Sequence, residues 1–453
     1  MKPDDRAALG LTIGLVLIIT TFAVDALALV AAMPVIESDL GGRQWYGAVF
    51  SLFVVANIVA IVATGRQVGR YSFSTMLVVG LAVFAIGLAL GAAAPSMFTL
   101  ALTRSIQGLG AGILATVTYA IVASRFDDAQ RPKVLAAIST AWVVPSLIAP
   151  SGAAWVAEQF HWRWVFVILL VMVVPAAALT VPRLRHVANP PPESVRRGQL
   201  VAALAVAASI VLLQVGLAAG SLIVVVFTGL VCAAWLLSSL AKLLPPGSLT
   251  GQGVVGAAMM SKLLAGLVFL GTETFIPLAL TDVHGYSATV AGLALTAAAL
   301  TWTIGSWTVA RKHDSWSERA MNRVGHMIVA CGVLATMLVA TEVDGALIIA
   351  LCAWAFAGFG VGLVFGSVNV VALREAPEGS VGSVSASLQL ADVIGFAIAS
   401  GVGGALIAVG DRNDWHPGRA LLIWWGLLVG VSCFAAAVSP RHLPRRPRDL
   451  API

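Results

Sequence analysis

Five ionisable side chains lie inside long apolar stretches of this 453-residue sequence, where a charge needs a partner or a cavity. They are Asp25, Arg104, Lys262, Glu273 and Asp392. At the centre of a membrane-spanning helix such a group costs at least about 2.5–3.5 kcal/mol, so it is usually turned away from lipid. A carboxyl group in an apolar cavity is suited to exchanging a proton, because desolvation disfavours its charged form, and once ionised it attracts cations. The set predicts proton coupling or substrate binding; ion pairs that only join two helices are the simpler alternative.

The depths of these groups in their helices predict which of them can meet. Asp25 lies in the outer part of one helix and Arg104 at a similar depth in a helix of opposite direction, so the two are expected to pair. Lys262 and Glu273 are about 16 Å apart along one helix, at 1.5 Å per residue, which disfavours direct pairing. Glu273 is expected to line a central cavity, on a helix that bends at the following proline. Asp392 is the second candidate, and the alternative is a Glu273 that stays hydrated near the outer surface.

The elements that must position these groups are membrane-spanning helices. Apolar residues make up 59% of the sequence and charged residues 11%, against about 25% charged in soluble proteins. The mean hydropathy is +0.95, and a helix needs roughly 20 apolar residues to cross the hydrocarbon core. The first run is too long for the core of a signal peptide, so it is expected to be a retained helix. The runs lie near 8–36, 45–64, 73–94, 97–123, 134–156, 164–182, 200–218, 221–241, 253–281, 287–310, 324–341, 345–373, 381–409 and 419–439.

The basic residues predict the orientation of these fourteen spans. With both termini in the cytoplasm, most of the 27 Lys and Arg residues fall in cytoplasmic segments. The acidic residues show no such bias, which is the pattern of the positive-inside rule. The net charge of +6 therefore reflects topology and predicts no nucleic-acid partner. The basic residues of the outer loops are Arg43, Arg163, Arg412 and Arg419.

The order of runs and linkers predicts an all-α polytopic membrane protein with two six-helix bundles and an inserted hairpin. Residues 1–183 form the N-terminal bundle and residues 251–440 the C-terminal bundle. Residues 184–250 contain a proline-rich cytoplasmic linker and the two-helix hairpin, and residues 441–453 form a basic cytoplasmic tail. Two such halves are the layout of secondary transporters that alternate access around a site between them.

Other classes of protein leave no signature in the sequence. The phosphate-binding pattern G-x-x-x-x-G-K-[ST] is missing, which excludes a single-chain ATP-driven pump. The seven histidines are dispersed, mostly in loops, and no pair has metal-ligand spacing, so neither a metal nor another cofactor is expected. A membrane-embedded enzyme or a channel remains as a remote alternative.

The first run ends in a recognisable pattern. From Asp25 it continues Ala-Leu-Ala-Leu-Val-Ala-Ala-Met-Pro-Val-Ile-Glu-Ser-Asp-Leu, ending at Leu40. This resembles the D-x-T-I-V-N-V-A-L-P-x-I-x-x-D-L signature of the fourteen-helix drug:proton antiporters of the major facilitator superfamily. The family's asparagine is replaced here by Val30.

The fourth run resembles the superfamily motif R-x-x-Q-G-x-G. It contains Arg104, Gln107, Gly108, Gly110 and Gly112 in that register. The resemblance implies that Arg104 takes part in proton coupling. Small residues at this spacing also let helices approach closely, as do Gly358, Gly362 and Gly366 later in the chain.

The fifth run carries a weaker form of the antiporter motif G-P-x-x-G-G. Pro150 is present, but alanines replace the three motif glycines, at positions 149, 153 and 154, and Gly152 stands at a variable position. The following Trp162-Arg163-Trp164-Val-Phe resembles the family's W-R-W-x-F. The resemblance implies a conformational role for Gln107, Gly108, Gly112, Pro150 and Gly152.

The loop between the second and third runs departs from the family pattern. Where relatives have G-x-L-A-D-R-x-G-R-K, this chain has Gly65-Arg-Gln-Val-Gly69-Arg70-Tyr-Ser-Phe-Ser. Gly69 stands where the aspartate belongs and the closing basic pair is lost. The resemblance implies a gating loop at Gly65, Gly69 and Arg70 whose salt-bridge latch is altered.

The function expected from these features is secondary active transport. The leading hypothesis is proton-coupled export of lipophilic or cationic small molecules by alternating access; the alternative is export of a lipid or lipid-linked metabolite. The expected partners are the substrate, protons and the lipid bilayer. The protein is expected to act as a monomer in the plasma (inner) membrane of a bacterium, with both termini cytoplasmic.

Overall fold

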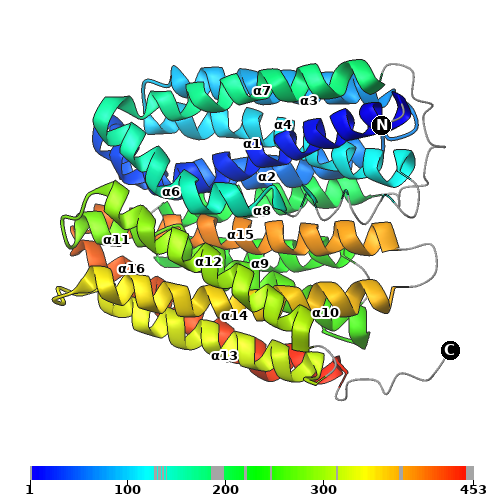
Figure 1. The fold of residues 1–453 in the computed structure, drawn as a ribbon. Coiled ribbons are helices and arrows are strands. Elements are labelled where there is room, and N and C mark those ends of the chain that lie inside the picture. Colours follow the sequence, from blue (N-terminus) through cyan, green and yellow to red (C-terminus); the bar gives the residue numbers. More distant parts are fainter. Residues whose placement is uncertain are drawn as a thin grey trace. The chain divides into compact units, whose positions relative to one another are not determined.

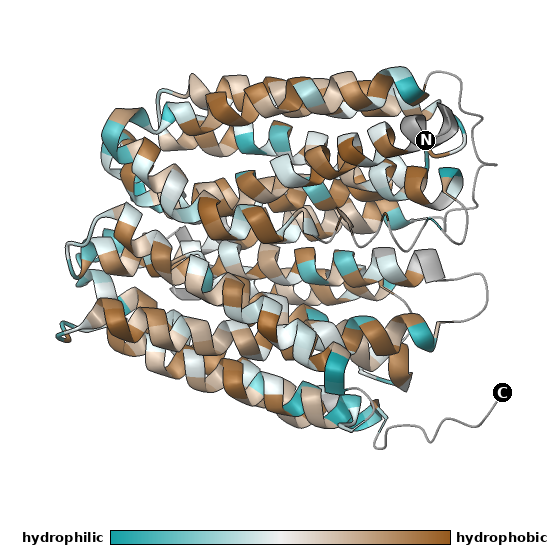
Figure 2. Ribbon diagram, viewed as in Figure 1, coloured by the Kyte–Doolittle hydropathy of each residue, from teal (hydrophilic) through white to brown (hydrophobic). Residues whose placement is uncertain are grey.

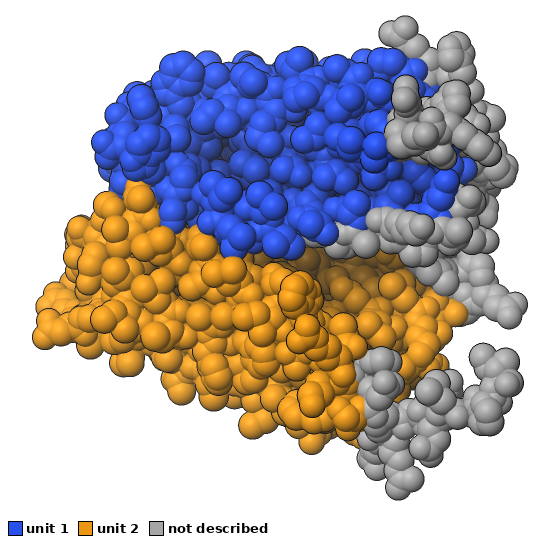
Figure 3. Space-filling view, viewed as in Figure 1, with its two compact units in different colours: residues 1–207 blue, residues 208–453 orange. Residues whose placement is uncertain are grey.

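The computed structural model shows a chain made of long helices (Figure 1). It describes residues 3–126, 140–184, 198–218, 222–244, 247–312, 315–376 and 381–444, together with residues 130, 134, 137 and 138. The chain divides into two compact units, residues 1–207 and residues 208–453 (Figure 3).

The helices of unit 1 follow the predicted runs. They are α1 (Pro3–Leu40), α2 (Tyr46–Gly65), α3 (Phe73–Ala92), α4 (Met97–Arg125), α6 (Val143–Val156) and α7 (Arg163–Leu184). Two further helices come next in the chain, α8 (Gln199–Ala218), which crosses the boundary between the units, and α9 (Leu222–Leu243).

The remaining helices belong to unit 2. They are α10 (Gly253–Glu273), α11 (Ile276–Asp282), α12 (Ala288–Lys312), α13 (Glu318–Thr336), α14 (Ala346–Arg374), α15 (Val381–Arg412) and α16 (Pro417–Val438). A short break at residues 274–275 separates α10 from α11, and both belong to one apolar segment of 30 residues.

Eleven helical segments in the described part of the chain are long and apolar enough to cross a membrane. Apolar residues run along their length, whereas polar residues gather at the ends and in the loops (Figure 2). With α6, α8 and α9, the described part of the chain has fourteen helical segments at the fourteen predicted runs. The prediction of an all-helical membrane protein is confirmed.

Two helices begin a few residues before the apolar runs that predicted them. The predicted run at 324–341 begins as a helix at Glu318, because the Ser317 side chain accepts a hydrogen bond from the Ala320 backbone N–H and caps it. Likewise α1 begins at Pro3, not at residue 8. Both first turns are polar, so a count of apolar residues misses them. Of the run at 134–156, part lies outside the described residues.

Glycines set the closest helix contacts in both units, as the sequence predicts. In α4, Gly108 and Gly112 lie against backbone carbonyls of α2, and Gly110 lies against the backbone of α3. In α14, Gly358 and Gly362 lie against backbone carbonyls of α12. A methyl group at any of these five positions would overlap its neighbour, so α4 and α14 are each fixed at the centre of their unit.

Candidate functional site

The two ionisable residues predicted inside spans of unit 1, Asp25 and Arg104, form one buried cluster with Gln107. The Arg104 Nη1 donates hydrogen bonds to both carboxylate oxygens of Asp25, at 2.9 and 3.1 Å. It also donates to the Gln107 Oε1 at 2.6 Å, while the Gln107 Nε2 donates to the Asp25 Oδ1 at 2.8 Å. The expected pairing of Asp25 with Arg104 is therefore present, and Gln107 closes the triangle.

The surroundings of this triangle are apolar. Asp25, Arg104 and Gln107 are 1%, 2% and 0% exposed, and the Arg104 guanidinium lies 4.1 Å from the ring centroid of Phe53. One buried nitrogen, Arg104 Nε, makes no hydrogen bond within the described residues. Both carboxylate oxygens of Asp25 are therefore hydrogen-bonded, and its charge is paired with that of Arg104.

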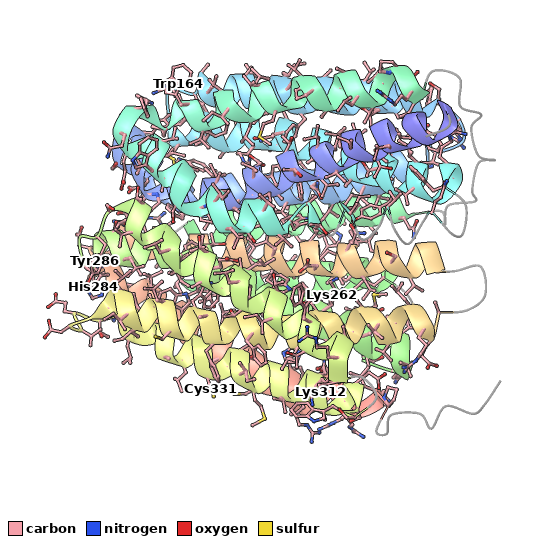
Figure 4. The ribbon with its side chains drawn as sticks, in the orientation of Figure 1. Trp164, Lys262, His284, Tyr286, Lys312 and Cys331 are labelled. Carbon is pink, nitrogen blue, oxygen red and sulfur yellow. The ribbon has the colours of Figure 1, made fainter. Side chains whose placement is uncertain are left out.

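Lys262 is the buried cation of unit 2. It lies on α10, away from the end of the unit that carries His284 and Tyr286 (Figure 4), and is buried. Its Nζ donates to the Asn369 Oδ1 of α14 at 2.9 Å and lies 4.8 Å from the Phe365 ring centroid.

Asp392 of α15 is a carboxylate close enough to Lys262 to interact with its charge. The two groups attract each other electrostatically, without a direct ion pair among the described atoms. The Asp392 Oδ1 lies against Gly266, one turn after Lys262, and makes no hydrogen bond within the described structure. The structure therefore brings Lys262 and Asp392 into one polar site.

Glu273 is separate from that site. It is the last residue of α10, directly before the break at residues 274–275, so the predicted bend is present. Its side chain is 8% exposed and lies beside the indole N–H of Trp354, which makes no direct hydrogen bond to a described residue. This burial disfavours the alternative of a hydrated carboxylate at the outer surface.

The sequence analysis missed a buried polar network next to Lys262. The Ser261 Oγ accepts a hydrogen bond from the Asn322 Nδ2 at 2.8 Å and lies 2.9 Å from the His326 Nε2. His326, which falls within the predicted run at 324–341, is 0% exposed in α13. Asn322 and His326 are four residues apart on one helix face, and that spacing could have revealed them.

Some residues of the predicted conformational motifs lie at helix contacts, and others do not. Gly108 and Gly112 touch α2, and Pro150 is buried inside α6. A side chain at Gly152 would meet only Ile148 of its own helix. Two other motif segments meet: the Trp162 Nε1 donates to the Asp39 Oδ2 at 2.7 Å and the Arg163 Nη1 lies 3.6 Å from it, which joins the end of α1 to the start of α7.

The predicted gating loop of unit 1 is a tight turn without a salt bridge in the described structure. Gly65 ends α2, Gly69 has a left-handed φ of 86° and Arg70 is exposed. Ser72 caps α3 after this loop, as Ser317 caps α13 in unit 2. At that matching place in unit 2, the Arg374 Nη1 lies 2.7 Å from the Glu318 Oε1.

Comparison with known proteins decides the family. The model of the Major Facilitator Superfamily matches residues 13–400. The chain belongs to this superfamily. Its fold and family are those of transporters, not of enzymes.

Individual relatives are distant in sequence, and they cover different shares of the chain. A probable multidrug-efflux transporter of Mycobacterium tuberculosis is 26% identical over 472 residues, which cover 96% of each chain. The fatty acid resistance protein FarB of Neisseria gonorrhoeae is 29% identical over 64% of this chain and 60% of its own length. The crystal structure of a D-xylose–proton symporter matches with a TM-score of 0.67 at 14% identity, covering 98% of this chain and all (100%) of the symporter, which shows the common fold alone.

Proposed function

We propose that this protein exports lipophilic or cationic small molecules in exchange for protons. The observation that carries the proposal is Glu273, a buried carboxyl in a membrane-spanning segment that has no cation beside it among the described residues. Such a group can be neutralised by a proton or by a cationic substrate. Once one of them has neutralised the carboxylate, it no longer attracts the other. Competition of this kind is what an exchange mechanism needs.

The other buried charges have supporting roles in this proposal. Asp25, Arg104 and Gln107 form a balanced cluster that fixes α1 on α4. Lys262 and Asp392 form a second site, in which a cation and a carboxylate attract each other. Both are candidates for contact with the substrate.

The names of the relatives support efflux of drugs over export of a lipid. Besides the Mycobacterium tuberculosis transporter, the multidrug efflux pump SdrM of Staphylococcus aureus is 25% identical over 37% of this chain and 38% of its own length. We assign the chain to the fourteen-helix drug:proton antiporter branch, with two six-helix bundles, α8 and α9 as the inserted hairpin, and alternating access. Both termini lie in the cytoplasm and the membrane is the bacterial inner membrane.

A transport screen in proteoliposomes tests this function. Purified protein is reconstituted with and without an imposed pH gradient and offered lipophilic cations, neutral lipophilic compounds and fatty acids. We expect counterflow of at least one lipophilic cation, with net transport accelerated by the gradient and stopped by a protonophore. Transport of fatty acids alone would favour the lipid reading, and transport indifferent to the gradient would refute proton coupling.

A further inference from the structure

The two units repeat one helix packing residue by residue. In each unit, two glycines four residues apart lie against backbone carbonyls of the neighbouring helix. The four contacts are Gly108 with Phe53, Gly112 with Asn57, Gly358 with Ala298 and Gly362 with Trp302. These contacts place α4 on α2 in the same way as α14 on α12.

A third helix in each unit extends the repeat. Two glycines of α3 and two of α13, seven residues apart in each helix, contact α4 and α14 at matching positions. The contacts are Gly80 with Leu114, Gly87 with Gln107, Gly325 with Val364 and Gly332 with Ala357. Each contact residue of α4 has a counterpart in α14 whose residue number is higher by 250, as for Gly108 and Gly358. By this shift, Arg104 corresponds to Trp354.

The residues beside these two positions also correspond. Arg104 of α4 binds Asp25 of α1, and Trp354 of α14 lies beside Glu273 of α10. In unit 1 the carboxylate therefore meets a cation, whereas in unit 2 it meets the uncharged N–H of an indole. Trp354 is fully buried and stacks on Phe269, with ring centroids 4.5 Å apart, which fixes the direction of that N–H.

No other charge compensates Glu273 among the described residues. Asp392 of α15 lies at Gly266, about 10 Å before Glu273 along α10 at 1.5 Å per residue, and is attracted by Lys262 on the same helix. His326 of α13 contacts Ser261, which lies further still along α10.

The charged residues at the ends of the neighbouring helices interact with groups other than Glu273. On α14, Arg374 pairs with Glu318. On α16, Arg419 lies over the Trp415 ring, and the group of α16 that reaches α10 near Glu273 is the indole N–H of Trp424, which donates to the Gly271 carbonyl. On α11, Asp282 lies next to Thr281 and accepts a hydrogen bond from its hydroxyl.

We propose that Trp354 and Glu273 are the counterpart of the Arg104–Asp25 pair in unit 2, and that Trp354 positions Glu273 as the carboxyl that takes up and releases the transported proton. Arg104 and Gln107 bind both oxygens of Asp25, and these contacts favour its ionised form. The indole stabilises the ionised form of Glu273 only weakly, so both protonation states are accessible. This inference rests on the proposed function for its transport role, but the protonation itself can be observed without any substrate.

Carbodiimide labelling tests the protonation directly. Dicyclohexylcarbodiimide reacts with protonated carboxyl groups in apolar surroundings, and mass spectrometry of the full-length protein in liposomes locates the adduct. Between about pH 5.5 and about pH 8.5, where a carboxyl removed from water titrates, we expect Glu273 to be labelled increasingly as pH falls and Asp25 to remain unlabelled. Labelling of Asp25 with Glu273 untouched would overturn the assignment.

Two substitutions test the part of Trp354. Trp354→Phe keeps the stack on Phe269 but removes the N–H, so the midpoint of Glu273 labelling should move up by roughly 0.5–1 pH unit, because the ionised form loses a stabilising donor. Trp354→Arg supplies the cation found in unit 1 and should suppress labelling of Glu273 over the whole range.

The matched control is Trp425→Phe. Trp425 is also fully buried with an indole N–H that makes no hydrogen bond within the described residues, but it lies on α16. It should leave the labelling midpoint unchanged. Equal shifts for Trp354→Phe and Trp425→Phe would refute the positioning role. Correct labelling combined with gradient-independent transport would instead refute the proposed function and leave this inference standing.

Discussion

At the scale of the residue, the account rests on how each buried charge is compensated. Asp25 has three hydrogen bonds from Arg104 and Gln107, whereas Glu273 has only a neighbouring indole. The same chemical group, a carboxyl, is thereby expected to serve as a structural anchor in one unit and as an exchangeable site in the other.

Replacement of Arg104 by leucine is expected to abolish transport and to destabilise the protein. Breaking one side of a buried pair costs about 3–5 kcal/mol, because the remaining charge is left without compensation. Thermal unfolding of the purified protein and counterflow in liposomes measure the two effects. The double variant Arg104→Leu with Asp25→Asn should recover most of the stability, since both charges are removed. An Arg104→Leu protein as stable as the parent would show that the pair is not the anchor.

The sequence alone could predict this pair but not the partner of Glu273. Two opposite charges at one depth in apolar helices have few alternatives to meeting each other, and the motif spacing adds Gln107. The sequence does not mark Trp354 as the partner of Glu273, because a tryptophan in an apolar helix is usually an ordinary core residue. Its role depends on the register of α14 against α10, which only the structure supplies.

At the scale of the element, glycine contacts fix the register of the central helices. The Gly358→Ala variant is expected to be less stable by about 1–3 kcal/mol, because the added methyl overlaps the Ala298 carbonyl. The Gly430→Ala variant is the control: a methyl there meets no atom within 4 Å, and alanine favours the helix. Melting temperatures of both proteins in detergent provide the comparison. A Gly358→Ala protein that melts with Gly430→Ala would contradict the packing role.

Helix positions follow from the sequence more closely than helix ends do. The apolar runs located the membrane segments because lipid demands continuous apolar surface. They missed the starts of α1 and α13, where polar first turns continue the helix beyond the apolar part. The closely matched glycines of α4 and α14 were visible as spacing, but their partners on α2 and α12 were not.

At the scale of the whole molecule, the proposed arrangement of fourteen spans makes a prediction about sidedness. Cysteines introduced at Ser315 and at Glu342 lie in consecutive loops on either side of α13 and should react from opposite sides of the membrane. The four native cysteines are first replaced, since three of them are exposed on the protein surface. Labelling in intact cells and in inverted vesicles gives the answer. Reaction of both positions from one side would refute the span count.

The boundaries between the two bundles cannot be located from hydropathy alone. The predicted boundaries at residues 183 and 251 came from linkers rich in proline and charge, and they stay predictions. The compact units of the structure instead meet within α8, at residues 207 and 208. An inserted hairpin carries few buried polar groups, so its sequence leaves little to assign it to either half.

The central claim is that substrate movement is tied to proton movement in the opposite direction. Proteoliposomes loaded with ethidium and a trapped pH-sensitive dye, with membrane potential clamped by potassium and valinomycin, are diluted into dye-free, ethidium-free buffer. The account predicts that the lumen acidifies as ethidium leaves, and that Glu273→Gln liposomes and liposomes without protein show no such acidification. Ethidium efflux by the parent protein with no change in luminal pH would contradict it.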